Sequence, residues 1–141
     1  MEKIIVIDTE TVTGARGLLS VGAVVLERDG DAVKTLDTYF GFSDEYEYGF
    51  YYAQQVAYAR RNRVKRKPRS EIETELAGMV CRHDVHTAFA YNASFDKAVS
   101  GRYLPSLDFT WLDLMEPARR ILASDEHYPA YKRLHPHTEL T

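Results

Sequence analysis

Residues 4–11 read Ile-Ile-Val-Ile-Asp-Thr-Glu-Thr, the most hydrophobic run of this 141-residue chain, followed directly by two acids. Four consecutive β-branched residues are typical of a central strand that is covered on both faces. Side chains two apart on a strand point to the same face. Asp8 and Glu10 are therefore expected to project together from the carboxyl end of this strand, where open α/β sheets tend to bind ligands.

Two carboxylates held this close repel each other, and burying either one is costly unless its charge is compensated. A hard divalent cation such as Mg²⁺ or Mn²⁺ would compensate it, because these ions prefer oxygen ligands. The same triplet also fits a strand that simply ends, with both acids facing water. An Asp-x-Glu triplet by itself does not decide between the two interpretations.

Two more apolar runs follow at residues 18–27 and 33–42, and the dipeptide Asp29-Gly30 lies between them. Asp-Gly between two such runs is a strong hairpin signal. The chain is therefore expected to open with three consecutive antiparallel strands. An aromatic-rich stretch at 46–58 comes next, and residues 52–64 are compatible with a helix.

The second half alternates between helix and strand patterns. Ser70 and Glu73 have the spacing of a capping box, which predicts a helix that buries Ile72, Leu76, Met79 and Val80. Two short strands are predicted at 86–91 and 109–112. Between them, Asn92 can cap a helix to about residue 103 that turns Phe95, Ala98 and Val99 to the core. Apolar spacing predicts a last helix over 113–123.

The predicted order is β-β-β-α-β-α-β-α, an α/β fold with a five-stranded mixed sheet flanked by helices. Helical crossovers would make the later strands parallel to the first. One domain is expected over residues 1–123, followed by an irregular tail over 124–141.

Composition excludes several classes of protein. The formal net charge is −3, and Cys81 is the only cysteine, so neither an internal disulfide nor a cysteine-rich zinc site is possible. No stretch approaches the length of a membrane span, and the N-terminus lacks signal-peptide character. The chain is expected to be cytoplasmic, with no membrane partner.

Residues 60–69 read RRNRVKRKPR, with seven of the ten positions basic. Such a cluster can contact phosphates, or it can form a solvated helix face or a loop. Its position beside many tyrosines makes nucleic-acid contact reasonable, because aromatic rings stack on bases. The candidate phosphate contacts are Arg60, Arg61, Arg63, Lys65, Arg66 and Lys67.

A second acidic motif follows the strand predicted at 86–91, where Asn92-Ala93-Ser94-Phe95-Asp96 opens a helix. An acid in the first turn of a helix also has a purely structural explanation, because it interacts favourably with the helix dipole. Together with residues 4–11, however, this segment resembles motifs I and II of the DEDD superfamily of 3′→5′ exonucleases. That group includes polymerase proofreading subunits, ribonuclease T and oligoribonuclease. The resemblance runs from the start of the chain to about residue 122, and it implies an RNase H-like fold.

The resemblance also implies roles for individual residues. Asp8, Glu10 and Asp96 would be catalytic ligands of two Mg²⁺ or Mn²⁺ ions that hold the scissile phosphate at the 3′ end of single-stranded DNA or RNA. Thr9 and Thr11 would contact the terminal nucleotide. Asn92 would fix the start of the helix that carries Asp96.

The chain departs from the family pattern in one important respect. The family has a third motif, His-x-x-x-x-Asp or Tyr-x-x-x-Asp, and no His or Tyr here is followed by Asp at either offset. The final helix of the family is also expected to be missing. Three explanations remain open. The chain is a fragment, which we favour; a second chain supplies the missing groups; or the chain is a non-catalytic derivative that kept the fold.

The expected function is therefore metal-dependent 3′→5′ exonuclease activity, reduced if no general base is supplied. The alternative is a catalytically inactive module that keeps the fold and binds nucleic acid or another protein. The sequence does not separate DNA from RNA as the substrate.

Overall fold

The structure is a computed structural model that describes residues 2–115. Most of the helix predicted over 113–123 and all of the tail predicted over 124–141 lie outside the described residues. No helix within residues 2–115 is long and apolar enough to cross a lipid bilayer.

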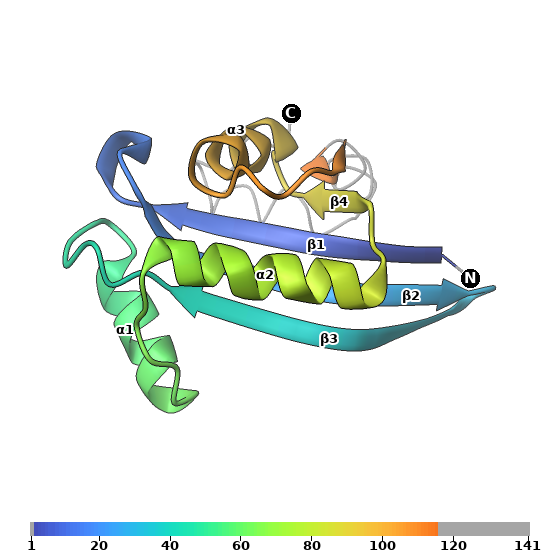
Figure 1. Cartoon of the computed structure of the whole chain (residues 1–141), viewed down its shortest axis with the longest axis horizontal. Helices are drawn as coiled ribbons and strands as arrows, with labels where there is room; N and C mark the ends of the chain where they lie inside the picture. Colours follow the sequence, from blue (N-terminus) through green and yellow to red (C-terminus); the bar gives the residue numbers. More distant parts are fainter. Residues whose placement is uncertain (1, 116–141) are drawn as a thin grey trace, which may run out of the picture.

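A single five-stranded sheet organises the chain, and its strand order is β3-β2-β1-β4-β5 (Figure 1). The strands are β1 (Glu2–Thr11), β2 (Leu18–Asp29), β3 (Ala32–Phe42), β4 (Thr87–Ala90) and β5 (Thr110–Asp113). The first three form antiparallel pairs, whereas β4 and β5 run parallel to β1. The predicted α/β fold class with a mixed five-stranded sheet is confirmed.

Three α-helices and one short 3₁₀ helix connect the strands. They are η1 (Thr13–Ala15), α1 (Tyr52–Arg61), α2 (Arg69–His83) and α3 (Ala93–Tyr103). The predicted capping box is wrong, because Pro68 occupies the N-cap position of α2 and Ser70 lies inside the helix. The carboxylate of Glu73 instead accepts hydrogen bonds from Arg69 and from Ser106, which ties α2 to the segment after α3.

The main core lies between one face of the sheet and the helices α2 and α3. Alternate residues of β1, Ile5 and Ile7, are fully buried there against α2 residues Ile72 and Leu76. Figure 1 shows α2 lying along the sheet in front of β2, between β1 and β3. This face therefore fixes the register of β1, because a slip of one residue would turn its buried set to the opposite side.

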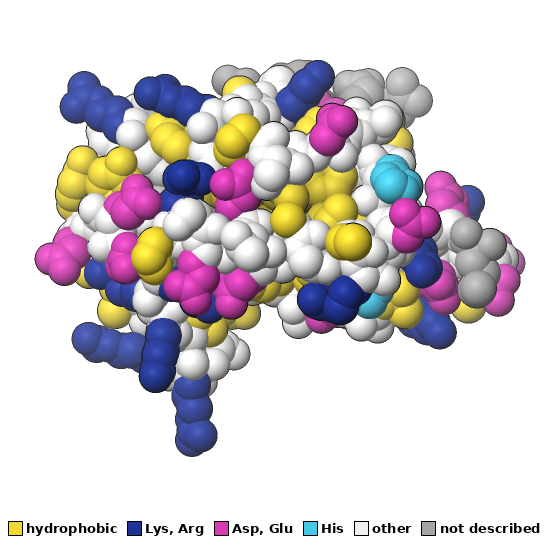
Figure 2. Space-filling view, in the orientation of Figure 1, with side chains coloured by type: hydrophobic (Ala, Val, Ile, Leu, Met, Phe, Trp, Pro, Cys, Tyr) yellow, Lys and Arg dark blue, Asp and Glu magenta, His cyan; other side chains and the backbone are white. Residues whose placement is uncertain are grey.

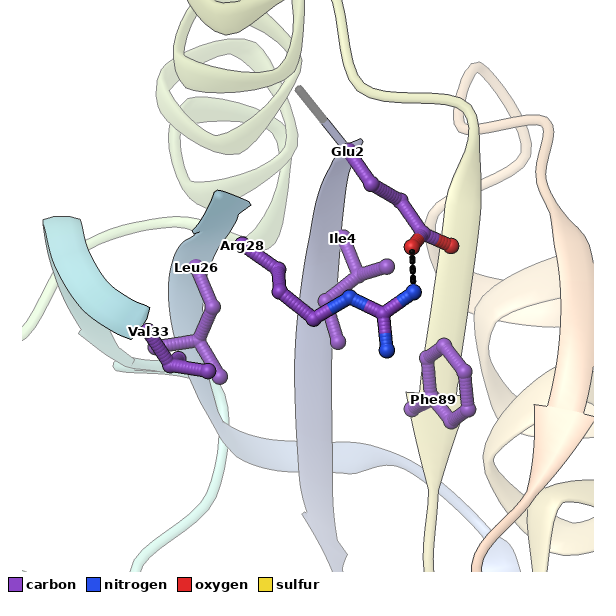
Figure 3. Close-up of a pocket in the computed structure, with 6 residues that line it drawn as sticks. All are labelled: Glu2, Ile4, Leu26, Arg28, Val33 and Phe89. Carbon is purple, nitrogen blue, oxygen red and sulfur yellow. Dashed lines mark hydrogen bonds and ion pairs between the residues drawn. The ribbon is translucent and has the colours of Figure 1, made fainter. Parts of the chain in front are cut away.

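The opposite face of the sheet carries apolar side chains that stay partly exposed. At the end where β1 begins, Ile4, Leu26, Val33 and Phe89 line an open hollow with the ion pair between Arg28 and Glu2 at its edge (Figure 3). Val33 is 60% exposed. The apolar run predicts that both faces of β1 are covered. Within residues 2–115, only the face that packs against α2 is fully covered.

A second, smaller core holds α1 at the other end of the sheet, where β1 and β3 finish. Buried Phe42 and Ala59 meet there, with Val12 and Leu19 beside them. The Phe40 and Tyr58 rings pack edge to face, with their centroids 4.6 Å apart. This packing places α1 next to the strand end that carries the two predicted carboxylates.

Candidate acidic site

Asp8 and Glu10 lie near the end of β1 on the same face of the sheet, as the alternation predicts. Both point away from the main core: Asp8 is exposed and Glu10 is partly exposed. Their partners on β2 are Gly22 and Ser20, respectively. Because these two neighbours are small, the strand end is left hollow around the carboxylates.

Asp96 reaches the same strand end from the first turn of α3. Its Oδ1 atom accepts hydrogen bonds from the backbone N–H of Thr9 at 2.9 Å and from the Thr9 hydroxyl at 2.6 Å. The pairing of β4 with β1 reaches only as far as Val6 and Phe89. Asp96 therefore accepts from the backbone N–H group of Thr9, which lies beyond the last residue of β1 that pairs with β4. The Asp96 residue is buried, with 3% of its surface exposed.

The structure thus brings together the three acids that were predicted as catalytic and metal-binding residues. They line one hollow of about 520 Å³, which is in the usual size range for ligand sites. The remaining residues that line it are Thr9, Thr11, Tyr51, Tyr91, Asn92, Phe95 and Met115. This places all three residues predicted to bind substrate, Thr9, Thr11 and Asn92, at the same hollow.

The three carboxyl groups share a field of negative charge. Burial raises the pKa of Glu10 to about 7, and the nearby carboxylates of Asp8 and Asp96 contribute to the rise. Although Asp8 is exposed, the protein around its carboxyl group limits the hydration of that group, and this effect raises the pKa of Asp8 together with the Asp96 charge. Burial also raises the pKa of Asp96, although the hydrogen bonds from Thr9 oppose that rise. Among the described residues, no positive charge compensates these three acids.

Carboxylate oxygens are the donor type that Mg²⁺ and Mn²⁺ prefer, so the chemistry of these three residues fits a divalent cation. Their present arrangement is open. Within residues 2–115 no three His, Cys, Asp or Glu side chains are already grouped as ligands of one ion. Since Asp96 is turned toward Thr9, the carboxylates would have to draw together around an ion.

Sequence reasoning missed the structural role of Thr9. It was expected to contact the nucleotide, but it is buried on the core face of β1, and both its N–H and its hydroxyl donate to Asp96. The alternation that places Asp8 and Glu10 on one face also places Thr9 on the other. That alternation indicated that Thr9 faces the core, where it can position an acid carried by α3.

Asp113 was also missed as part of the site's framework. Its Oδ1 atom accepts from the backbone N–H groups of Asn92 at 3.1 Å and of Met115 at 2.9 Å. Asn92 precedes α3 in the left-handed conformation, which asparagine tolerates better than most residues. The predicted cap is wrong, because the Asn92 side chain makes no cap hydrogen bond; its Oδ1 atom instead accepts from the Ser94 hydroxyl at 3.2 Å. Asp113 directly follows a predicted strand, as Asp8 does, and this position could have indicated its role in the framework of the site.

Two residues predicted to face the core from α3 do not do so. Phe95 is 40% exposed and lines the acidic hollow, and Ala98 is exposed, whereas Val99 is buried as predicted. Asp96 and Val99 occupy the buried stripe of the helix, so the ring one residue before Asp96 must face outward. Tyr51 and Tyr91 are also substantially exposed beside it.

The basic segment 60–69 divides into two parts. Arg66 donates to the carbonyls of Ser43 and Tyr46 and lies over the Phe42 ring, and Lys67 forms an ion pair with Glu75 at 2.8 Å. These two predicted phosphate contacts are thus engaged within the protein. The remaining four are exposed and form no ion pair within residues 2–115: Arg60, Arg61, Arg63 and Lys65.

Lys and Arg side chains project from the molecule where Figure 1 draws α1, as the space-filling view shows (Figure 2). Of the four exposed cations, Arg61 lines a second hollow together with Asp8 and Glu10. Arg60, Arg63 and Lys65 line a different hollow beside Tyr52. Of these four, Arg61 is therefore the one that shares a hollow with the acidic site.

Comparison of the sequence with protein-family models and with curated proteins gives no match.

Proposed function

We propose that this chain is a divalent-metal-dependent 3′→5′ exonuclease domain that acts on single-stranded DNA or RNA. The observation that carries the proposal is the meeting of Asp8, Glu10 and Asp96 in one hollow at the end of β1. A hydrogen bond between residues 87 positions apart in the sequence holds Asp96 there. This is the arrangement that the resemblance to the DEDD exonucleases implies.

Asp8, Glu10 and Asp96 would hold the Mg²⁺ or Mn²⁺ ions. Such ions lower the pKa of a bound water and stabilise the leaving 3′ oxygen in phosphodiester hydrolysis. Thr9 fixes the orientation of the Asp96 carboxylate through its two hydrogen bonds. The exposed rings of Tyr91 and Phe95 flank the acids at the hollow and offer faces on which a terminal base can stack.

One observation favours the alternative, a binding module without turnover. The described lining of the acidic hollow contains three carboxylates and no histidine, so it supplies no evident general base for the attacking water. Without such a base, hydrolysis would be slower by about 10²–10⁴-fold. In the exonuclease proposal, a second chain or residues outside 2–115 provide the base and the fourth acid.

The direct test is incubation of a 5′-labelled single-stranded oligonucleotide with the protein and Mn²⁺, followed by gel electrophoresis. We expect stepwise shortening from the 3′ end that stops on chelation of the metal. Asp8→Ala should abolish the shortening. Asp31→Ala is the control, because it removes an exposed aspartate from the β2–β3 turn, away from the site.

The outcomes separate the two functions. Retardation of the oligonucleotide without shortening, weakened by salt as counterion release requires, would indicate the binding module. Neither shortening nor retardation with any divalent cation would overturn both.

A further inference from the structure

One face of α1 carries polar side chains and is turned toward the acidic site. Gln54, Gln55, Tyr58 and Arg61 follow the i, i+1, i+4, i+7 pattern and therefore lie on one side of the helix. All four line the second hollow, of about 330 Å³, whose other wall includes Asp8. The opposite side of α1 is anchored in the smaller core through Val56 and Ala59, so the polar face is presented on a fixed element.

The groups on this face have the properties of a phosphate-backbone contact. Arg61 is exposed, and among the described residues it forms no ion pair, although two carboxylates line the same hollow. Gln55 accepts a hydrogen bond from the Ser20 hydroxyl at 3.0 Å through Oε1, which leaves its amide nitrogen as the end available to a ligand. The Tyr58 ring is 41% exposed and braced edge to face by Phe40.

Asp8 and Glu10 form the boundary between two hollows. On one side are the exposed rings of Tyr91 and Phe95 with Asp96; on the other is the polar face of α1. A phosphodiester held at the carboxylates would have one nucleotide in each hollow. The next phosphate on the 5′ side would then lie toward the guanidinium of Arg61, a group suited to bidentate phosphate contact.

We propose that this face of α1, with Arg61 as its charged group, binds the sugar-phosphate backbone on the 5′ side of the scissile bond. The inference rests on the proposed function and specifies its substrate class. A single strand of several nucleotides is preferred over an isolated nucleotide ester, because only the strand reaches Arg61. The terminal nucleotide occupies the hollow beside Tyr91 and Phe95.

The test compares two substrates in Mn²⁺: a single-stranded octanucleotide and the p-nitrophenyl ester of thymidine 5′-monophosphate, which has no 5′ neighbour. For Arg61→Ala we expect kcat/KM to fall ~10-fold on the octanucleotide and less than ~2-fold on the ester. The slope of log KM against log salt concentration should also decrease by roughly one, because one phosphate contact is lost. Arg28→Ala is the control, since Arg28 is also an exposed arginine but lies beside Glu2 at the opposite end of the sheet, where β1 begins.

Each outcome decides one question. If the wild-type protein hydrolyses both substrates and Arg61→Ala behaves like Arg28→Ala on the octanucleotide, the inference is overturned and the proposed function stands. An equal loss on both substrates also overturns it, because Arg61 would then act at the scissile phosphate. If the wild-type protein hydrolyses neither substrate, the proposed function itself fails.

Discussion

Two groups of acids in this molecule differ in how their charge is compensated. Asp37 and Glu75 sit beside basic side chains: Asp37 contacts His83 and Arg82, and Glu75 contacts Lys67. The hydrogen bond from His83 lowers the pKa of Asp37, and the one from Lys67 lowers the pKa of Glu75. At the end of β1, burial raises the pKa of all three acids instead, and repulsion from neighbouring carboxylates adds to the rise for Asp8 and Glu10.

This difference is not caused by a shortage of cations. Four exposed basic residues lie on or just after α1, and Arg61 lines a hollow with Asp8 and Glu10 without pairing to either. Within residues 2–115, Asp37 and Glu75 are paired with basic side chains, whereas the three carboxylates at the end of β1 have no basic partner and so keep a destabilising charge there. That charge is what a divalent cation would neutralise, so the contrast itself is testable.

The largest expected effect comes from replacing Asp96 with its uncharged isostere. The new side-chain amide would still offer an oxygen to Thr9, so Asp96→Asn should fold. Its cleavage rate should nevertheless fall by ~100-fold or more, and Mn²⁺ should no longer raise its thermal unfolding midpoint, because one carboxylate ligand is lost. Oligonucleotide cleavage and thermal unfolding with and without Mn²⁺ measure both effects.

The matched variant from the compensated group is Asp37→Asn. It breaks the contacts with His83 and Arg82, which should cost ~1 kcal/mol of stability or less, and should leave both cleavage and the Mn²⁺ response unchanged. A Mn²⁺ response that persists in Asp96→Asn and disappears in Asp37→Asn would reverse the assignment of the two groups.

The next effect is a pH dependence of stability in the metal-free protein. The unfolded Glu10 carboxyl releases its proton near pH 4.5, whereas the folded one keeps it until about pH 7. The unfolded state thus binds fewer protons between these values, so stability must fall as pH rises from 5 to 8, and Asp8 and Asp96 act in the same direction. Allowing for partial exposure, Glu10 should contribute roughly 1–2 kcal/mol to the decline.

Urea unfolding in chelator across this range measures the decline, and Glu10→Gln should flatten it. The depressed pKa values of Asp37 and Glu75 act in a different window. Their stabilisation is present above the unfolded pKa and is lost only as pH falls below about 4. If wild-type and Glu10→Gln proteins gave the same profile between pH 5 and 8, the charge at the strand end would not be uncompensated.

Most of the fold was predictable because its signals are local. The apolar runs and the Asp29-Gly30 turn predict β2 and β3 to within two residues of their observed ends, and the helical stripe predicts α2 with Ile72, Leu76 and Met79 buried. The capping box failed because the helix begins after Pro68, before Ser70, and Glu73 bonds instead to Ser106, which lies 33 positions away. A partner at that separation leaves no trace in the local pattern.

The sequence predicted which residues form the site better than it predicted how they contact each other. Alternation along β1 places Asp8 and Glu10 together, and the motif resemblance adds Asp96. The contact between Thr9 and Asp96 was not foreseen, because it depends on where β4 stops pairing with β1. The outward turn of Phe95 likewise depends on which stripe of α3 packs on the sheet, and a short helix with only a few apolar residues does not specify this.

A smaller effect is expected from Thr9→Val, which keeps the shape of the side chain but removes the hydroxyl that donates to Asp96. The variant should lose ~1 kcal/mol of stability, since one buried hydrogen bond disappears while the backbone N–H of Thr9 still donates. Cleavage should fall ~10-fold because Asp96 is less firmly oriented. Thr9→Ser should restore most of the activity, and a Ser variant as weak as Val would point to packing rather than to the hydrogen bond.

The smallest effect should come from Lys67, which was predicted as a phosphate contact but forms an ion pair with Glu75. A partly exposed pair of this kind contributes ~1 kcal/mol or less, so a double-mutant cycle of Lys67→Met and Glu75→Gln should give a coupling energy in that range. Oligonucleotide affinity should not change, because binding a phosphate would require Lys67 to leave Glu75. If Lys67→Met weakened oligonucleotide binding as much as Arg61→Ala did, and Glu75→Gln strengthened it, Glu75 would be competing with nucleic acid for Lys67. Lys67 would then be a residue that binds nucleic acid and not only a structural one.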